Sequence, residues 1–372
     1  MKNSKILHCL PALDDGLSSH LCERLVTQLS PRLDHSIVTI SGVPDVAHRR
    51  VRAHFPADLP QFDGMPTPGR LTKIAQSMAA YDLVLTYDYG ALNVAMAHTA
   101  FSQAFGLPPL IHHEFGYGES DSRELTGRRN WYRRIALGRA YGIVVPSERL
   151  EGLALTTWQQ PIGRVKHIFL GVKVDRKPRK VAADSLRGLI KRDGEQWIGT
   201  LGNSAERADW LQVLGALERL PENWQLIVAG EDAHLAALRE HAEKSELSHR
   251  VHFPGVIEDP SVLLGLLDIY IELESSDVFP FNPLQAMAVA LPIAGISTAD
   301  LRQLTSEANI DYIVERNRKQ GLREALVALA QHALARVRAG EQNHKRADDE
   351  FSEDIMIDKF RRLYASALGR EL

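Results

Sequence analysis

An acidic side chain and an amide side chain flank the predicted start of a helix between residues 268 and 295. Asp277 lies in the loop after a short β-branched run, and Asn282 and Pro283 open the helix. Asparagine is a favoured N-cap residue, and proline is well tolerated at the first helical position. The unpaired N–H groups and the dipole of a helix start attract anions. This stretch therefore predicts an anion-binding site at the carboxyl end of a strand.

Two strands and one helix must hold this site in place. Residues 269–273 alternate in a pattern typical of a strand, and residues 293–296 predict the next one. Leu284 and Met287 share the apolar face of the helix, and Pro292 is expected to end it. Strand, loop, helix and strand form one α/β crossover of a parallel sheet. Such a crossover is common and does not by itself select a ligand.

The spacing within this crossover resembles the donor-binding segment of family 4 glycosyltransferases. Their signature has two glutamates separated by seven residues, followed by Ala-Met-Ala-x-Gly-x-Pro. Here Asp277 and Gln285 stand at the two acidic positions, and residues 286–292 read Ala-Met-Ala-Val-Ala-Leu-Pro. The frame is kept, whereas both glutamates and the glycine are replaced. The resemblance implies a catalytic role for Asp277 and donor contacts from Phe279, Pro280, Asn282 and Gln285.

Length and composition fit a two-domain protein. A chain of 372 residues is long for one core, and its 44% hydrophobic and 24% charged residues are ordinary for a soluble globular protein. The net charge of −3 gives no general attraction to nucleic acid. Two cysteines, Cys9 and Cys22, build no disulfide framework, so a reduced, cytoplasmic setting is expected. No apolar run is long enough to predict a membrane span.

The amino-terminal part begins with a predicted buried strand at residues 6–10, a turn, and a helix capped by Ser18 or Ser19. The family often has a Gly-Gly loop at this turn, and Asp15-Gly16 keeps one glycine. The resemblance implies that Gly16 lets a donor or acceptor approach the backbone, and we assign it to the donor site. A plain turn is the alternative.

Two motifs that would indicate other chemistry are absent from the sequence. No Gly-x-Gly-x-x-Gly follows a predicted strand, which counts against a dinucleotide oxidoreductase. Asp88 is flanked at two residues' distance by Thr86 and Gly90, so it does not complete a metal-binding Asp-x-Asp motif.

His112, His113 and Glu114 end another predicted strand. Adjacent strand residues point to opposite faces, so the two histidines cannot chelate one metal, and no metal site is expected. In the family, a histidine at this strand end faces the cleft near the reacting sugar. The resemblance therefore makes His113 or His112 the candidate, and Glu114 would line the same mouth. We assign His113 as catalytic and place His112 and Glu114 on the acceptor side. A buried histidine with bonded ring nitrogens is the alternative.

Arginines interleave with aromatic residues on a predicted helix between residues 123 and 139: Arg123, Arg128, Arg129, Trp131, Tyr132, Arg133, Arg134 and Arg139. Such a run is usually a solvated face. The same pattern also suits an anionic membrane surface or a lipid-diphosphate acceptor. We accordingly place Arg128 and Arg129 on the acceptor side.

A charged, proline-containing linker at residues 173–180 precedes a second set of strands. Relatives carry an arginine and a lysine after the first of these strands, and both hold the donor diphosphate. Asn203 stands at the arginine position, and Arg207 stands beside the lysine position. Residues 251–256 resemble the family strand whose backbone reads the donor base. The implied donor contacts here are Asn203, Arg207, Gly230, Gly255 and Val256.

We therefore expect an α/β protein of the GT-B architecture, with two Rossmann-like domains facing one another across a cleft. The acceptor-side domain is expected at residues 1–175 and the donor domain at residues 190–345. A C-terminal helix at residues 350–372 should cross back to the first domain.

The implied activity is retaining transfer of a sugar from a nucleotide-diphosphate donor to a glycan or lipid-linked acceptor in polysaccharide or glycoconjugate assembly. Neither a metal nor another cofactor is expected, and nucleic acid is not an expected partner. A cytoplasmic protein with peripheral contact at the inner, anionic membrane face would fit. Two alternatives remain open: a degenerate binding or scaffold protein, supported by the lost cations and by Gln285, and a nucleotide-sugar epimerase or hydrolase of the same fold.

Overall fold

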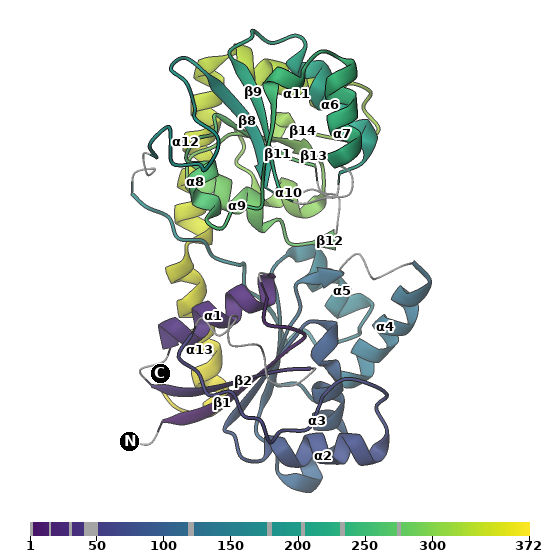
Figure 1. Ribbon diagram of the computed structural model, residues 1–372. Coiled ribbons are helices and arrows are strands. Elements are labelled where there is room, and N and C mark those ends of the chain that lie inside the picture. The colour runs from purple at the N-terminus through teal and green to yellow at the C-terminus, as the bar shows by residue number, and fades with distance from the viewer. Residues whose placement is uncertain are drawn as a thin grey trace. The chain divides into compact units, whose positions relative to one another are not determined.

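The computed structural model describes residues 3–14, 16–29, 32–40, 51–117, 123–176, 181–201, 205–230, 235–273 and 277–372, except for the side chains of residues 123–126, 237 and 277. The chain forms two compact units (Figure 1). Unit 1 comprises Met1–Leu170, Asp277–Phe279 and Asp354–Leu372, and unit 2 comprises Gly171–Ser276 and Pro280–Glu353.

Unit 1 contains a six-stranded parallel sheet in the order β2-β1-β3-β4-β6-β7. Its strands are β1 (Ser4–Leu10), β2 (Leu33–Thr39), β3 (Leu83–Tyr87), β4 (Leu110–His113), β6 (Gly142–Val145) and β7 (Val165–His167). The strands are buried almost throughout, as expected of a sheet covered on both faces. The strand order reverses between β1 and β3, and such a switch point leaves a crevice at the carboxyl ends of the two strands.

Helices cover both faces of this sheet (Figure 1). One face carries α1 (Leu17–Leu29) and α13 (Glu353–Leu368), and the other carries α2 (Pro68–Met78), α3 (Leu92–Phe105), α4 (Arg123–Ala136) and α5 (Glu148–Thr156). A short 3-10 helix (Tyr89–Ala91) follows β3. The C-terminal helix α13 belongs to unit 1, as predicted, and buries Phe360 and Tyr364 there.

A two-stranded antiparallel sheet joins distant parts of the sequence within unit 1. It pairs β5 (Gly116–Tyr117) with β12 (Asp277–Val278). Asp277 pairs with Tyr117, and Val278 pairs with Gly116. The segment between two elements of unit 2 thus contributes a strand to unit 1.

Unit 2 contains a second six-stranded parallel sheet in the order β10-β9-β8-β11-β13-β14. Its strands are β8 (Gln196–Leu201), β9 (Trp224–Ala229), β10 (Val251–Gly255), β11 (Ile269–Glu272), β13 (Ile293–Ile296) and β14 (Ile313–Val314). Its switch point lies between β8 and β11. The two parallel sheets confirm the predicted α/β class with two Rossmann-like domains.

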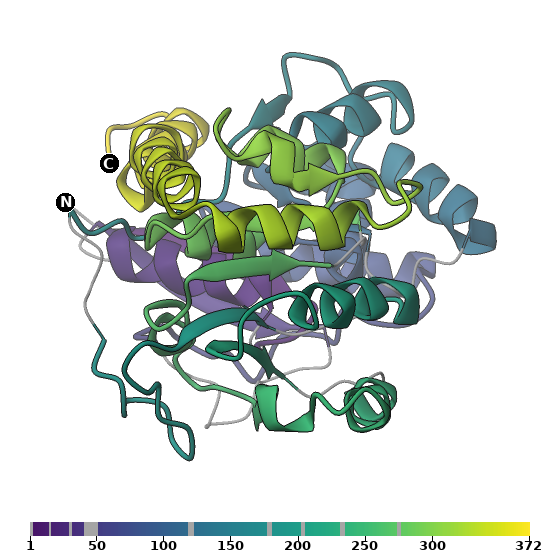
Figure 2. The same ribbon diagram turned by 90° about the horizontal axis from the view of Figure 1, so that it is seen from above.

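The helices of unit 2 also form two layers (Figures 1 and 2). One layer contains α6 (Arg207–Leu217), α7 (Leu235–Lys244) and α11 (Gly321–Gln331), and the other contains α8 (Pro260–Leu264), α9 (Phe281–Ala288) and α12 (Ala333–Phe351). Helix α10 (Ala299–Leu304) and two 3-10 helices (Ser248–Arg250 and Ile310–Tyr312) complete the unit. Among the described residues, no helix is long and apolar enough to cross a membrane.

Helix α9 differs from its predicted form at both ends. It begins at Phe281 with Pro280 as N-cap, so Asn282 lies inside the first turn and caps nothing. The helix ends at Ala288, four residues before Pro292. Ala290 then adopts a left-handed conformation with φ 63°, at the position where the family signature has glycine.

Helix α12 packs against α9 through a position that only glycine can fill. A Cβ atom at Gly340 would collide with the carbonyl oxygen of Ala290. Helix α12 is separated from α11 by His332, whose φ of −108° and ψ of 80° are not helical. The second helix then runs on to Phe351.

Candidate functional site

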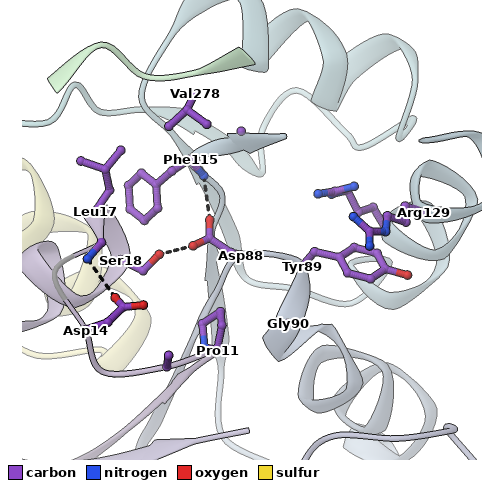
Figure 3. A pocket seen from close by; sticks show the side chains of 14 residues that line it. Pro11, Asp14, Leu17, Ser18, Asp88, Tyr89, Gly90, Phe115, Arg129 and Val278 are labelled. Carbon is purple, nitrogen blue, oxygen red and sulfur yellow. Dashed lines mark hydrogen bonds between the residues drawn. The ribbon is translucent and has the colours of Figure 1, made fainter. Parts of the chain in front are cut away.

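A pocket of about 450 Å³ opens at the switch point of unit 1 (Figure 3). Its walls come from the loop after β1, the turn after β3, the residues after β4, and Val278 of β12. Gly90 allows the first two walls to meet, because a Cβ atom there would lie 2.9 Å from Cβ of Pro11. Gly16, assigned to the donor site from the sequence, also lines this pocket.

Asp88 lines this pocket with a carboxylate that two hydrogen bonds hold. Its carboxylate accepts hydrogen bonds from the Ser18 hydroxyl and from the backbone N–H of Phe115, the latter at 3.1 Å. Burial raises the pKa of Asp88 to about 7, with a further contribution from the negative charge of Glu114. Its backbone has φ 52° and ψ −178°, a region that residues other than glycine rarely enter. Sequence analysis considered Asp88 only as part of a metal motif and missed this environment.

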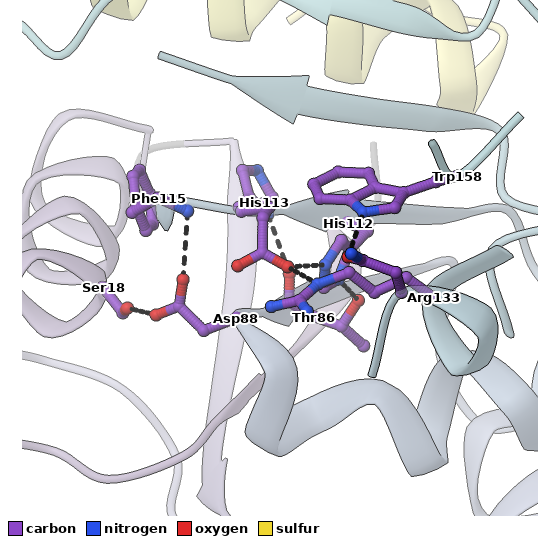
Figure 4. A network of polar contacts seen from close by, with 10 residues as sticks. Ser18, Thr86, Asp88, His112, His113, Phe115, Arg133 and Trp158 are labelled. Carbon is purple, nitrogen blue, oxygen red and sulfur yellow. Dashed lines mark hydrogen bonds and ion pairs between the residues drawn. The ribbon is translucent and has the colours of Figure 1, made fainter. Parts of the chain in front are cut away.

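A buried ion pair lies beneath the pocket (Figure 4). Arg133 Nε donates to Glu114 Oε2 at 2.7 Å, and both side chains are 1% exposed. Burial acts to raise the pKa of Glu114, but Arg133 and His112 outweigh it, so this pKa lies below its usual range. His112 Nε2 lies 3.7 Å from the same carboxylate, and its Nδ1 lies 2.9 Å from the hydroxyl oxygen of Thr86. Glu114 and His112 therefore support the pocket from below.

His113 is fully buried, and so is His112. This burial agrees with the alternative given for the two histidines in the sequence analysis. Its Nδ1–H donates to the Thr86 carbonyl at 3.1 Å, and its Nε2 accepts from the Tyr364 hydroxyl at 3.0 Å. Burial lowers the pKa of His113 to about 3, so the ring is neutral near pH 7. The physical reason is that α13 covers the face of β4 toward which His113 points.

The arginines of α4 divide between surface and core. Arg128 and Arg129 line a second cavity of about 930 Å³ in unit 1, together with Met65 and Trp131, which are 80% and 63% exposed. The Arg129 guanidinium lies 4.7 Å from the ring centroid of Tyr89, and Tyr89 borders both cavities. Arg133 is buried instead, so the arginine run is not a single solvated face. The side chain of Arg123 lies outside the described residues.

The predicted donor residues of unit 2 lie at or near the carboxyl edge of its sheet. Asn282 Nδ2 donates to the Leu201 carbonyl at 3.1 Å, which fixes the start of α9 at the end of β8. Gly230 N–H donates to the Gly255 carbonyl at 2.9 Å, and both glycines have positive φ, 116° and 80°. Val256, next to Gly255, is 68% exposed. This arrangement brings the ends of β8, β9 and β10 to one edge.

Three further predicted donor residues flank these strand ends or fall outside the description. Arg207 is exposed and is the first residue of α6, the helix that follows β8. Gln285 is half-buried on α9. Asn203 lies outside the described residues.

Arg316 is a cation near α6 that sequence analysis missed. Its Nη1 lies 2.8 Å from Asp209 Oδ2 and 2.9 Å from Glu206 Oε1. It thereby holds the first turn of α6 to the segment after β14. No local pattern could have shown this, because the partners lie more than a hundred residues apart.

The residues of the predicted donor loop divide between the two units. Asp277 and Phe279 belong to unit 1, whereas Pro280, Asn282 and Gln285 belong to unit 2. Phe279 is buried, and its N–H donates to the Phe115 carbonyl at 3.3 Å. The Asp277 side chain lies outside the described atoms, but its neighbour Val278 lines the Asp88 pocket.

Comparison with known proteins supplies the context for these sites. Residues 185–346 match the family model described as "Glycosyl transferases group 1". No curated protein matches the chain.

Solved structures resemble the whole chain. HepE from Anabaena, crystallised with UDP and glucose, has a TM-score of 0.77 at 14% identity, covering 98% of this chain and 100% of HepE. Sucrose-phosphate synthase from Thermosynechococcus elongatus has a TM-score of 0.74 at 15% identity, covering 98% and 99%. WaaG, a glycosyltransferase involved in lipopolysaccharide biosynthesis, has a TM-score of 0.69 at 16% identity, covering 96% and 99%. The protein therefore has the predicted GT-B fold, and most of its second unit matches the group 1 glycosyl transferases.

Proposed function

We propose that this protein is a family 4 glycosyltransferase that moves a sugar, with retention of configuration, from a nucleoside-diphosphate donor to a glycan or lipid-linked acceptor. The observation that carries the proposal is the match of residues 185–346 to the group 1 family, since that range contains the predicted donor residues of unit 2. The GT-B fold, shared with a protein crystallised with UDP-glucose, supports it.

Unit 2 supplies the proposed donor site at its switch point. The exposed backbone near Gly255 and Val256 suits a nucleobase, and the start of α9 near Asn282 offers N–H groups to a phosphate. A helix start contributes only about 0.3–1 kcal/mol to an exposed anion, so a side-chain cation is also needed. We assign this role to Arg207. Gln285 would accept a ribose hydroxyl through its amide oxygen.

In this proposal the departing diphosphate is stabilised without a metal ion. Its developing charge would be met by Arg207 and by the backbone N–H groups of α9, which are already oriented before the reaction. The family resemblance gives Asp277 a role at the reacting centre, and the pairing of β12 with β5 fixes its backbone.

Unit 1 supplies the proposed acceptor side. Arg128 and Arg129 line a cavity whose rim carries exposed Met65 and Trp131. Cations beside apolar and aromatic side chains suit an anionic, lipid-linked acceptor and an anionic membrane surface. We therefore place the protein in polysaccharide or glycoconjugate assembly, in the cytoplasm and at the inner face of the membrane.

The proposal is tested by measuring melting temperature and nucleotide release with a panel of UDP, GDP, ADP and dTDP sugars. A donor that binds only the folded state stabilises it by about 2.7 kcal/mol at a hundred times its Kd. Arg207→Ala should weaken the shift, and Arg219→Ala should not, because Arg219 lies exposed beyond the opposite end of α6. A shift without nucleotide release with any acceptor would favour the scaffold alternative, and no shift would contradict the proposal.

A further inference from the structure

Most of the proposed donor residues lie in unit 2, and none of the roles assigned so far involves Asp88 in the unit 1 pocket, which Gly16 also lines. This pocket is placed where an open α/β sheet binds ligands, at the carboxyl ends of β1 and β3. The backbone of Asp88 has φ 52° and ψ −178°, a conformation that is unfavourable for residues other than glycine. Ser18 and Phe115 hold its carboxylate in place from two directions (Figures 3 and 4).

The lining of the pocket selects against several kinds of ligand. The carboxyl groups of Asp14 and Asp88 would repel a phosphate, and Arg129 and Arg133 would disfavour a purely apolar group. Among the described residues, no group of three acidic, histidine or cysteine side chains is arranged to hold a metal ion. A sugar fits this mixture, because its hydroxyl groups both donate and accept and its C–H faces lie well against rings such as Phe115.

The carboxylate of Asp88 retains hydrogen-bonding capacity for such a ligand. An ionised carboxylate has about four acceptor positions. Ser18 and Phe115 each use one, on different oxygen atoms. Because both oxygens are held, the remaining positions keep fixed directions at the pocket wall.

We propose that Asp88, positioned by Ser18, binds a hydroxyl group of the acceptor sugar in the unit 1 pocket and thereby selects the acceptor. This inference rests on the proposed transferase function. It assigns a binding residue that lies outside the family-matched range and outside the acceptor residues inferred from the sequence.

The ionisation of Asp88 gives the proposal a distinct signature. Its pKa is raised to about 7 by burial and by Glu114, while Ser18, Phe115 N–H and Arg133 oppose this rise. The other charged groups that line the pocket are Asp14 and Arg129. An ionised carboxylate accepts hydrogen bonds more strongly than a neutral carboxyl group. Acceptor binding should therefore strengthen as pH rises through about 7.

The experiment compares wild type with Asp88→Asn, Ser18→Ala and the control Asp82→Asn. Asparagine keeps the shape of aspartate and tolerates positive φ, so the backbone at position 88 need not change. Asp82 lies just before β3, at the opposite edge of the same sheet, and its carboxylate accepts from the Lys5 N–H. With the donor that gives the largest thermal shift, p-nitrophenyl glycosides serve as acceptor probes.

We expect Asp88→Asn to lower kcat/KM for the acceptor tenfold to a hundredfold through a higher acceptor KM, with donor affinity unchanged within twofold. Ser18→Ala should give a smaller loss in the same parameter, and Asp82→Asn should give none. The rise of wild-type kcat/KM through pH 7 should disappear in Asp88→Asn. An unchanged acceptor KM, or an unchanged pH profile in this variant, would overturn the proposal.

If the protein turns over none of the p-nitrophenyl glycosides, their direct binding is measured instead. Saturation-transfer NMR with the same glycosides should then show binding to wild type and weaker binding to Asp88→Asn. Equal binding, or no binding to wild type, overturns the inference about Asp88. A retained shift with the nucleotide sugar would leave the proposed function standing, whereas loss of that shift in wild type would contradict the function itself.

Discussion

Arg133 and Glu114 form an ion pair in which Nε lies 2.7 Å from Oε2 and both side chains are almost completely buried. The Arg133 guanidinium also lies 5.0 Å from the ring of Tyr89 and 5.4 Å from that of Trp158. One side chain thus connects α4, the strand end of β4 and the wall of the Asp88 pocket.

Removing one partner of this pair should destabilise the protein strongly. Arg133→Met leaves the Glu114 charge buried without its cation, and such a change typically costs about 3–5 kcal/mol. Arg133→Met combined with Glu114→Gln removes both charges and should recover part of the loss. Urea unfolding of wild type, both single variants and the double variant measures this coupling. Additive single effects would show that the pair contributes little.

Acid should destabilise unit 1 through its buried and half-buried histidines. Burial lowers the pKa of His20 and His35 to about 4 and that of His113 to about 3, and it holds the pKa of His8 well below 6.5. Below about pH 6.5 each histidine becomes protonated in the unfolded chain but stays neutral in the folded protein until the pH approaches its lowered pKa. The contribution of each histidine to the free energy of unfolding is complete above pH 6.5. It falls by about 1.4 kcal/mol for each pH unit below that value.

The contribution of Asp88 to stability changes in the opposite direction over nearly the same pH range. Its folded pKa of about 7 exceeds the ordinary value of 3.8, so its contribution becomes more favourable as pH falls from 7. Four histidines against one aspartate predict a net loss of stability from pH 7 to pH 5. Urea midpoints at several pH values measure it. Replacing His35, which lies 2.9 Å from His8, with asparagine should reduce the slope; an unchanged slope would contradict the account.

The tight packing at Gly340 and the open surroundings of Gly152 predict opposite effects of an alanine substitution at these two positions. Gly340→Ala should cost more than about 3 kcal/mol, because the added Cβ meets a backbone carbonyl that cannot move alone. Gly152→Ala, inside α5 with no atom within 4 Å of the added Cβ, should instead stabilise by about 0.5–1 kcal/mol. Thermal unfolding compares the two. Equal stability of the Gly340→Ala variant and wild type would disprove the close contact.

The surface of α4 predicts salt-sensitive membrane binding. Replacing Arg128, Arg129 and Arg134 with glutamine should abolish sedimentation with vesicles containing phosphatidylglycerol, while leaving the buried Arg133 intact. Trp131→Ala should weaken binding at high salt as well, since its contribution is apolar. If the triple variant binds vesicles as well as wild type does, the proposed membrane contact of α4 is wrong.

The sequence predicted the sheets well because many of the strands, such as β6, β11 and β13, are short and largely apolar runs. It failed where a distant segment decides a local feature. Asn282 looked like an N-cap, yet its amide bonds a carbonyl 81 residues away. The family resemblance made His113 a catalytic candidate, but no local pattern could show that Tyr364 of α13 would bond its ring. In the sequence Arg133 is one member of a charged run, but in the structure it pairs with Glu114 in the core.

Asp88 was missed for a different reason. Its neighbours Thr86 and Gly90 exclude a metal motif, but the sequence around Asp88 carries another signal. Asp88 follows the strand of residues 83–87, which begins with three apolar residues, and it precedes Gly90. A carboxylate at that strand end is a candidate ligand-binding group whatever its neighbours are.

The central claim is that unit 2 binds a nucleoside-diphosphate donor. Hydrogen exchange, measured with and without the nucleotide sugar that raises the melting temperature most, tests this claim directly. The account predicts slower exchange at amides of residues 205–208, 230, 255–256, 281–282 and 284–285, without comparable change in strands of the unit 1 sheet. Absence of protection with every nucleotide sugar, or protection confined to unit 1, would contradict it.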